Sequence, residues 1–130
     1  MADFIKSMQA ASSGMAAQSA RLRVTSENIA NADTPGYRRK ILPFEEVMDR
    51  QSGAVRVAPG RLFLDDAEFE RVQDPSHPLA NEMGYYEASN VDLIIEIADA
   101  REAQRSYEAN LKIFDQSRRM ASSLLDLLKQ

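Results

Sequence analysis

The architecture of this chain depends on one stretch, NVDLIIEIADAREAQRSYEANLKIFDQSRRMASSLLDLLKQ, at residues 90–130. Its apolar residues recur at alternating intervals of four and three, a pattern typical of a helix that meets another helix along one face. Neither Gly nor Pro interrupts the stretch, and strong helix formers fill most of it. Asn90 is the predicted N-cap, with Asp92 in the first turn, where the helix dipole favours a negative charge. The predicted face consists of Leu93, Ile97, Ala100, Gln104, Tyr107, Leu111, Phe114, Arg118, Ala121, Leu125 and Leu128.

The predicted helix is longer than the rest of the chain can cover. At about 1.5 Å per residue it would be roughly 58 Å long, whereas a compact globule of this chain length is about 35 Å across. Part of the apolar face must therefore be covered by other copies of the chain or by a partner. We expect Gln104 and Arg118 to set the register of that contact, because a polar residue in a helix seam lowers stability but specifies pairing.

A second amphipathic helix is predicted from about Asp3 to Asn31. Its apolar content is thin, because the run from Ala10 to Gly14 offers only small side chains and one residue that weakens helices. We therefore expect this helix to be marginal alone and to become ordered on assembly. In the same chain or in adjacent copies, the expected contact joins Met8, Met15, Leu22 and Ile29 to Ile97, Leu111, Phe114 and Leu125.

A sharp corner is predicted where this helix ends. Pro35 ends the helix, because the residue before a proline avoids the helical region. Pro35 and Gly36 suit the two central positions of a type II turn, in which glycine supplies the positive φ. From this corner we expect Tyr37 and the basic residues 38–40 to reach a neighbouring subunit.

The residues around the corner resemble the N-terminal signature of the flagellar rod and hook family, in which such a helix ends in Ala-Asn, a variable pair and Thr-Pro-Gly-Tyr. The matching residues here are Ser13, Gly14, Met15, Leu22, Asn28, Ile29, Ala30, Asn31, Thr34, Pro35, Gly36 and Tyr37. Further stretches resemble the small proximal-rod members of that family, so that the likeness covers nearly the whole chain. These stretches are residues 74–80, 84–85, 90–92 and 106–110. Two positions depart from the pattern: Ser89 stands where a proline often precedes the asparagine, and Ile97 stands where methionine is common.

The middle of the chain, residues 44–89, is predicted to form short strands and loops. Alternating or apolar runs at 54–57, 62–64 and 69–72 are separated by Gly and Pro turns. The expected fold class is mainly α with a small β-rich insertion, and by resemblance the long N- and C-terminal helices pair as a coiled-coil-like layer. The expected segments are an N-terminal assembly helix (1–34), a turn with a small β-rich lobe (35–90) and a C-terminal assembly helix (91–130).

The residue types give little support to catalysis or to metal binding. The chain has no Cys, which excludes disulfides and thiolate sites. Its single histidine, His77, has no second ligand or positioned nucleophile nearby and is interpreted as a structural or surface residue. The acidic residues 65–70 do not have the spacing of a calcium-binding loop and are interpreted as a solvated face. No catalytic, cofactor-binding or metal-binding residues are therefore predicted.

The charge pattern and the hydropathy indicate how the chain meets its surroundings. The basic residues 38–40 lie beside an acidic middle segment, which favours a solvated rim or a subunit contact with that segment over nucleic-acid binding. No stretch approaches the roughly 18 apolar residues of a membrane-spanning helix. The N-terminus has no basic region followed by an apolar run, so we expect any export to proceed without a cleaved leader.

The resemblance implies a structural subunit of the bacterial flagellar rod that assembles helically, transmits torque and performs no chemistry. It implies passage through the flagellar type III export apparatus and a place in the basal body, within the periplasmic space. The implied partners are copies of itself, other rod subunits, and basal-body adaptor and inner-membrane ring proteins, with no small-molecule substrate. One alternative is a soluble helical adaptor or export chaperone that binds a partner helix. A small hydrolase is a further alternative, which lacks a nucleophile and base.

Overall fold

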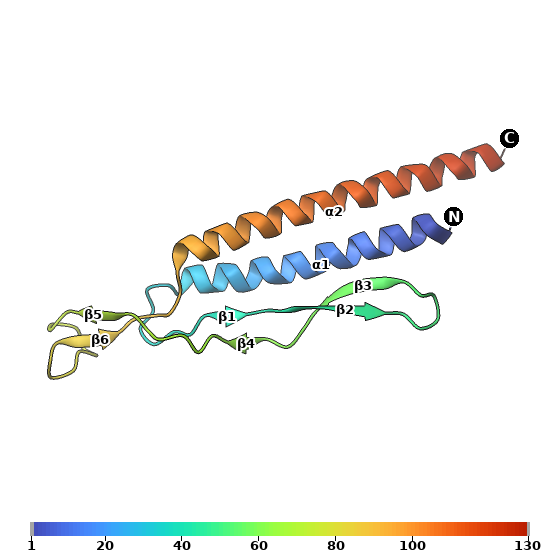
Figure 1. Ribbon diagram of the computed structural model, residues 1–130. Coiled ribbons are helices and arrows are strands. Elements are labelled where there is room, and N and C mark those ends of the chain that lie inside the picture. The colour runs from blue at the N-terminus through green and yellow to red at the C-terminus, as the bar shows by residue number, and fades with distance from the viewer. Residues whose placement is uncertain (1, 130) are drawn as a thin grey trace.

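A computed structural model describes residues 2–129 and shows three layers (Figure 1). One long helix, α2 (Leu93–Leu128), lies along a second, α1 (Ala2–Ala30). Narrow β ribbons run along the other side of α1, except for the ribbon within residues 71–87, which projects beyond the end of the helices. The chain ends of the two helices lie at the same end of the molecule, so the helices are antiparallel. This arrangement confirms the predicted fold class. The outermost residues of the predicted terminal segments, Met1 and Gln130, lie outside the described residues.

Helix α1 ends where the sequence predicts a corner. The side-chain amide of Asn31 donates to the carbonyl oxygen of Glu27 across 2.9 Å, which satisfies one of the free carbonyls of the last turn. Gly36 has a φ of 74°, and the Tyr37 amide donates to the Thr34 carbonyl oxygen across 3.1 Å. A positive φ at the third position, with this hydrogen bond, is the geometry of the predicted type II turn.

Helix α2 begins at a different cap from the one predicted. The N-cap is Asp92, whose carboxylate accepts a hydrogen bond from the Ile94 amide across 3.0 Å. Asn90 is therefore not the cap, because its side chain is engaged with the chain that follows α1. The helix continues for 36 residues, or about 54 Å.

The β structure consists of three separate two-stranded antiparallel ribbons. The pairs are β1 (Lys40–Ile41) with β4 (Phe63–Leu64), β2 (Phe44–Met48) with β3 (Val55–Pro59), and β5 (Arg71–Gln73) with β6 (Tyr85–Glu87). The runs predicted at 54–57, 62–64 and 69–72 correspond to β3, β4 and β5. Strands β1, β2 and β6 were not expected, because β1 and β6 are very short and two consecutive glutamates break the alternation of β2.

The chain buries few large apolar side chains within itself. The buried apolar residues of the described chain are all alanines: Ala11, Ala17, Ala103 and Ala121. The accessible surface is 9370 Å², which is about 2,500 Å² more than a compact monomer of this mass exposes. The single chain therefore leaves much of its apolar surface available for contact.

Candidate assembly surface

The two helices meet along a seam of small and polar side chains. Each helix contributes residues seven or fourteen positions apart, which is the repeat expected of two helices that pack side by side. The contacts are Ser7 with Ser117, Gly14 with Asn110, and Asn28 with Glu96. Ala103, which is fully buried, occupies the remaining position of this series on α2. We refer to this set of residues as the internal seam.

Gly14 lies at the closest approach of the seam. A Cβ atom at this position would stand 2.8 Å from Nδ2 and 2.9 Å from Oδ1 of Asn110. The Asn110 side chain is itself held, because its Nδ2 donates to the Ser106 carbonyl oxygen across 2.9 Å. Gly14, which the sequence analysis treated only as a weak point of α1, therefore makes room for Asn110.

Most of the predicted face of α2 lies beside the internal seam and stays partly exposed. Phe114 is half-buried, whereas eight of the other predicted assembly residues are exposed: Leu93, Ile97, Gln104, Tyr107, Leu111, Arg118, Leu125 and Leu128. Within the single chain this face is therefore covered only in part, because small residues let the two helices approach closely and the larger side chains stay at the edge of the contact. The expected pairing of this face with α1 remains a prediction. Contact of this face with adjacent copies stays a prediction.

The predicted residues of α1, Met8, Met15, Leu22 and Ile29, are all half-buried. Met8 and Phe114 line one groove of about 1040 Å³, which α1 forms with the β2–β3 hairpin. The hairpin is attached to the helix, because the Val57 amide donates to the Ser13 hydroxyl across 3.2 Å. Helix α1 is thus the middle layer, with α2 on one side and the hairpin on the other.

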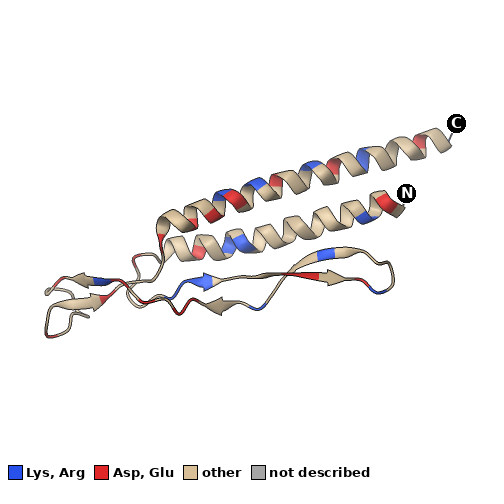
Figure 2. Cartoon of the chain, in the orientation of Figure 1, with Lys and Arg blue, Asp and Glu red and all other residues tan. Residues whose placement is uncertain are grey.

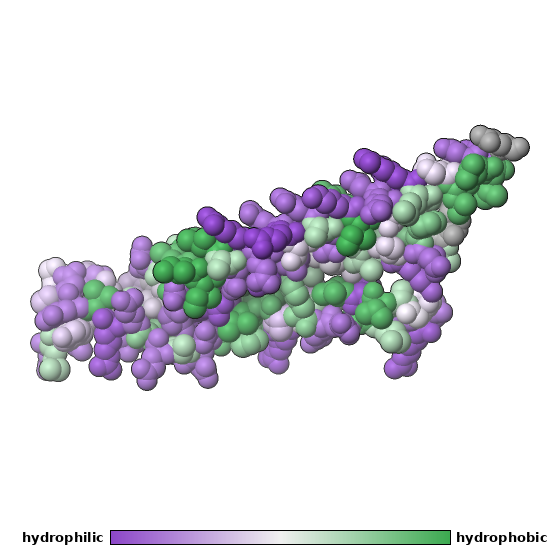
Figure 3. Space-filling view, turned by 45° about the horizontal axis from the view of Figure 1, so that its top comes forward, coloured by the Kyte–Doolittle hydropathy of each residue, from purple (hydrophilic) through white to green (hydrophobic). Residues whose placement is uncertain are grey.

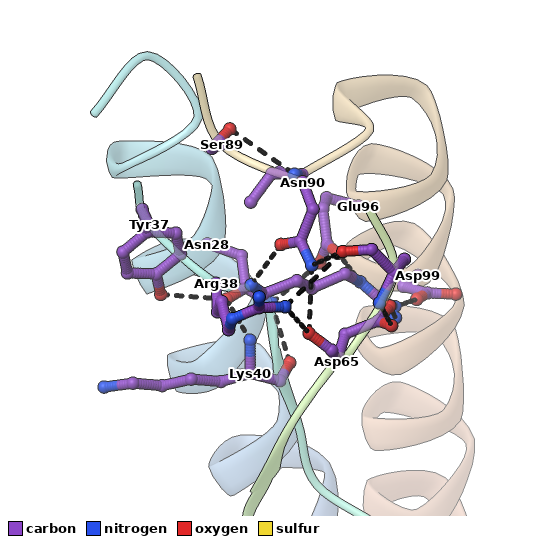
Figure 4. A network of polar contacts seen from close by, with 12 residues as sticks. Asn28, Tyr37, Arg38, Lys40, Asp65, Ser89, Asn90, Glu96 and Asp99 are labelled. Carbon is purple, nitrogen blue, oxygen red and sulfur yellow. Dashed lines mark hydrogen bonds and ion pairs between the residues drawn. The ribbon is translucent and has the colours of Figure 1, made fainter. Parts of the chain in front are cut away.

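A cluster of polar residues joins the end of α1, the start of α2 and the chain between them (Figure 4). We call it the polar junction. Its members are Asn28, Tyr37, Arg39, Lys40, Asp65, Asn90, Glu96 and Asp99. Three of them, Asn28, Tyr37 and Asn90, belong to the motifs that carry the family resemblance, and the junction therefore shows what these motif residues do in the fold.

Asn28 uses its whole side-chain amide in the polar junction. Its Nδ2 donates to the Lys40 carbonyl oxygen across 2.9 Å and to Glu96 Oε2 across 3.3 Å. Its Oδ1 accepts from the Tyr37 hydroxyl and from the Lys40 amide, each across 2.9 Å. Asn28 therefore pairs with the Lys40 backbone as a neighbouring strand would, and its polar atoms are satisfied although the residue is buried.

Asn90 plays a similar part from the other side. Its Oδ1 accepts from the Arg39 amide across 2.6 Å. Its Nδ2 donates to the carbonyl oxygens of Asp65 and Ala67 across 3.0 and 3.1 Å. The side chain therefore holds two other segments of backbone, at Arg39 and at Asp65–Ala67, which explains why it is not available as a helix cap.

Glu96 is a buried carboxylate, only 1% exposed, and Arg39 neutralises it. The Arg39 guanidinium donates to Glu96 through Nε and also forms ion pairs with Asp65 at 3.5 Å and Asp99 at 3.3 Å. A buried charge is tolerated when it is paired in this way. Burial alone would lower the pKa of Arg39, but the hydrogen bond and charge of Glu96 hold that pKa above its ordinary value.

The other residues of the Tyr37–Lys40 run also bind within the chain. Burial raises the pKa of Tyr37, and the negative charge of Glu27 raises it further. Lys40 forms an ion pair with Glu27 at 2.5 Å, and Arg38 lies over the Phe69 ring, 4.4 Å from its centroid. These side chains thus have partners within the chain, and their contact with a neighbouring subunit stays a prediction. The run does contact the acidic middle segment as expected, but within one chain.

Two positions that the sequence analysis discussed have structural roles. His77 stacks on Tyr86 with ring centroids 3.9 Å apart, and its Nδ1 accepts from the Leu79 amide across 3.1 Å. Ser89, where the family pattern often has proline, is buried, and its hydroxyl donates to the Ala32 carbonyl oxygen. This bond joins the corner after α1 to the segment before α2, and a proline could not make it.

Residues 2–129 contain no cluster of three or more metal-ligating side chains, and no helix among them has the length and apolar character needed to cross a bilayer. Of the acidic residues at 65–70, Asp65 pairs with Arg39, and Asp66, Glu68 and Glu70 are exposed. The features that stand out on the described chain are therefore the exposed face of α2 and the polar junction.

Two family models match this chain, and the regions that they match meet at the polar junction. Residues 8–38 match the family described as flagella basal body rod protein, and residues 82–127 match the family described as flagellar basal body rod FlgEFG protein C-terminal. The first match contains Asn28 and Tyr37, and the second contains Asn90 and Glu96.

Three relatives are similar along almost their whole length, and each is named flagellar basal-body rod protein FlgC. The protein from Agrobacterium fabrum is 47% identical over 126 residues, covering 92% of this chain and 91% of the relative. The Bacillus subtilis protein is 32% identical and covers 95% and 97%. The Salmonella typhimurium protein is 34% identical and covers 90% and 92%.

Proposed function

The chain belongs to the family of flagellar basal-body rod proteins, and from this premise we propose that it is a structural subunit of the proximal rod. Membership confirms the resemblance carried by the corner at Thr34–Tyr37 and by the stretches in the second half of the chain. The relatives that it matches are structural proteins of the flagellum, and no chemical reaction is proposed for this chain.

The observation that carries the proposal is the exposed apolar face of α2. Leu111 is 42% exposed and Leu125 is 45% exposed in a chain whose own buried apolar residues are alanines. Burial of apolar surface is the main favourable term in protein association. We propose that this face, with the predicted residues of α1, is covered by copies of the chain and by other rod subunits.

We propose a separate role for each of the three predicted segments. The terminal segments 1–34 and 91–130 would form the contact layer, and segment 35–90 would form the ribbons, two of which run along that layer and one of which projects beyond it. The polar junction connects all three through paired charges and hydrogen bonds. Such a connection supports a role in transmitting torque, because it gives the ribbons a fixed attachment to the helices.

We also propose that the subunit travels through the flagellar type III export apparatus to the periplasmic part of the basal body. The alanine-lined interior and the polar internal seam support this route, since apolar burial is the main favourable term in folding and this chain buries little of it. Adaptor and inner-membrane ring proteins of the basal body are the proposed neighbours at the base of the rod.

The family membership does not favour the alternative of a soluble adaptor or export chaperone. The test is to isolate basal bodies by detergent extraction and to probe them for this chain with an antibody. A rod subunit should remain with the extracted basal bodies and should be required for motility. Loss of the chain during extraction, with rods intact, would overturn the proposal.

A further inference from the structure

The β5–β6 ribbon presents apolar side chains at its far end. The ribbon projects from the end of the molecule at which α1 ends (Figure 1). Leu79 and Met83, in the loop between its two strands, are 64% and 79% exposed. We call this loop, residues 74–84, the ribbon tip. It includes a stretch, 74–80, that resembles the small rod proteins, and contacts between helices give that stretch no role.

The ribbon tip is held in one shape by contacts within itself. Asn81 Oδ1 accepts hydrogen bonds from the amides of Met83 and Tyr85, each across 3.0 Å. Gly84 has a φ of 84°, and a Cβ atom there would stand 2.9 Å from Cγ of Pro75. The exposed apolar side chains of the tip are therefore presented from a fixed backbone, which lowers the entropic cost of binding.

An apolar groove lies near the other end of the molecule, between the first half of α1 and the β2–β3 hairpin. Its volume is about 1040 Å³. Met48 and Val55 of the hairpin line it and are 66% and 45% exposed. Figure 3 shows hydrophobic residues at this end of the molecule, bordered by hydrophilic ones. We call it the hairpin groove, and the large apolar side chains that line it are Ile5, Met8, Val47, Met48, Val55 and Phe114.

The ribbon tip and the hairpin groove carry opposite charges. The charged residues of the tip, Asp74 and Glu82, are both acidic. The groove is lined by Arg50, Arg56 and one acidic residue, Asp49. The Asp49 carboxylate accepts hydrogen bonds within its own turn, whereas neither arginine forms an ion pair within residues 2–129. Figure 2 shows acidic residues along the ribbon, and basic residues at the hairpin turn and on β3.

The ribbon tip cannot fill the hairpin groove of its own chain. The groove contacts α1 within residues 5–16, whereas the ribbon lies beyond the end of α1 at Ala30. From residue 16 to residue 30 the helix rises about 21 Å, so the two surfaces are held apart. Every further copy of the chain carries both surfaces, and their opposite charges favour a second copy as the occupant of the groove.

We propose that the ribbon tip of one copy docks into the hairpin groove of a neighbouring copy. Leu79 and Met83 then contact the apolar lining, and Glu82 lies beside Arg56 of the neighbour. The inference rests on the proposed rod function and adds to it a contact that involves neither exposed face of α2. The contact joins unlike surfaces, so it is heterologous and leaves one free tip and one free groove to continue the assembly.

The size of the ribbon tip indicates what the contact does. A standard interface takes about 20–30 residues from each partner, which is more than the tip provides. We therefore expect the tip to orient the neighbouring copy, while other contacts supply most of the free energy of association. Its loss should reduce assembly and should leave the fold of the single chain unchanged.

The absence of cysteine from the chain permits a direct test by disulfide cross-linking. Two forms of the chain with different tags are co-expressed in cells that lack the native copy, one carrying Met83→Cys and the other Met48→Cys. After mild oxidation, basal bodies are isolated and the tags are detected. We expect a dimer that contains both tags. Leu79→Cys and Val55→Cys are the second reporters if either first variant does not support motility.

The control for cross-linking is Ser19→Cys, at an exposed position of α1 outside the groove, which should form no dimer with Met83→Cys. A dimer of Met83→Cys with itself in place of the mixed dimer would overturn the proposal. A cross-link to a different protein in its place, or no cross-link at all, would also overturn it.

A charge exchange tests the pairing of Glu82 with Arg56. Arg56→Glu and Glu82→Arg should each reduce swimming on soft agar and the yield of the mixed dimer, and the double variant should restore both. Both residues are exposed, so far-ultraviolet circular dichroism should not change. Arg61→Glu, at an exposed position that does not line the groove, is the matched control and should swim normally. Normal swimming of both single variants, or a double variant no better than either, would contradict the pairing.

The isolated basal bodies separate this inference from the proposed function. If the chain is present in them but no mixed dimer forms, the docking of the tip is wrong and the rod assignment stands. If the chain is absent from them, the rod assignment itself fails.

Discussion

Asn28 and Glu96 are in contact at the end of the helix pair nearest the Pro35–Gly36 turn. The Asn28 amide nitrogen lies 3.3 Å from a Glu96 carboxylate oxygen. Both side chains are 1% exposed. The contact joins the last turn of α1 to the first turn of α2 across 68 residues of sequence. A change in either side chain should therefore disturb the ends of both helices.

Asn28→Asp should destabilise the chain strongly. The substitution replaces a donor with an oxygen that faces the Lys40 carbonyl and the Glu96 carboxylate, which places unpaired acceptors together in a buried site. We expect a loss of about 3 kcal/mol in the free energy of unfolding, measured by urea unfolding with far-ultraviolet circular dichroism. Asn81→Asp is the matched control, because its bonds to Met83 and Tyr85 use only the oxygen. Equal stability of the two variants would contradict the role of Asn28.

Tyr37→Phe should change how stability depends on pH. Burial raises the pKa of Tyr37 above its ordinary 10.0, so the unfolded chain loses this proton more readily than the folded one. The contribution is therefore fully present below about pH 10 and is lost as the pH rises through the raised value. We expect the native chain to lose more stability than Tyr37→Phe on this alkaline side, measured as urea midpoints across pH. Parallel curves would show that burial of this hydroxyl does not matter.

Gly14→Leu should weaken the pairing of the two helices. The longer side chain collides with Asn110, and overpacking of this kind costs about 1–3 kcal/mol. Ser19→Leu, at an exposed position of the same helix, should have little effect. The double variant Gly14→Ala with Asn110→Ala removes the collision and gains helix propensity of about 1 kcal/mol. The midpoints of thermal unfolding of the native chain and the three variants give the comparison. Unchanged stability of Gly14→Leu would show that the two helices do not approach closely at Gly14.

Leu111→Asp should block rod assembly and motility while leaving the subunit expressed and helical. The residue is exposed in the single chain, so the charge does not disturb folding, but an unpaired charge in a buried contact costs several kcal/mol, about 2–5. Swimming on soft agar and immunoblots of isolated basal bodies measure the effect. Lys112→Glu, at the adjacent exposed position of α2, is expected to swim normally. Normal motility of Leu111→Asp would remove Leu111 from the interface.

Leu22→Pro should interrupt α1. A proline inside a helix removes one hydrogen bond and clashes with the preceding turn, at a cost of about 3 kcal/mol or more. We expect loss of helical signal and of motility. Asp3→Pro is the control, since the first turn tolerates proline. If both variants retained full helicity and motility, a continuous α1 would be unnecessary for function.

The sequence predicted the elements better than their contacts. Two long helices and the type II turn follow from periodicity, from Pro35 and from Gly36, which are local properties. The faces that meet do not follow, because hydropathy gives weight to residues such as Leu111 and little to Ser117 or Ala103. The internal seam is built from the residues that such a pattern counts least.

The polar junction could not be derived from spacing either. Asn90 has the position and chemistry of a helix cap, and only the path of the chain after α1 shows that Arg39 and Asp65 occupy its side chain. Tyr37 and Lys40 look like surface residues until Asn28 is placed beside them. The family resemblance identified several of these positions, but their bonding partners depend on three-dimensional proximity.

Because α1 is the middle layer, cleavage of this helix should affect the elements on both of its sides. Helix α2 and strand β3 each pack against α1, and little besides the polar junction ties α2 directly to the strands. Proteolytic nicking or truncation within these 29 residues would thus release two neighbours together, so damage near the N-terminus should yield separated fragments instead of a shortened but intact subunit.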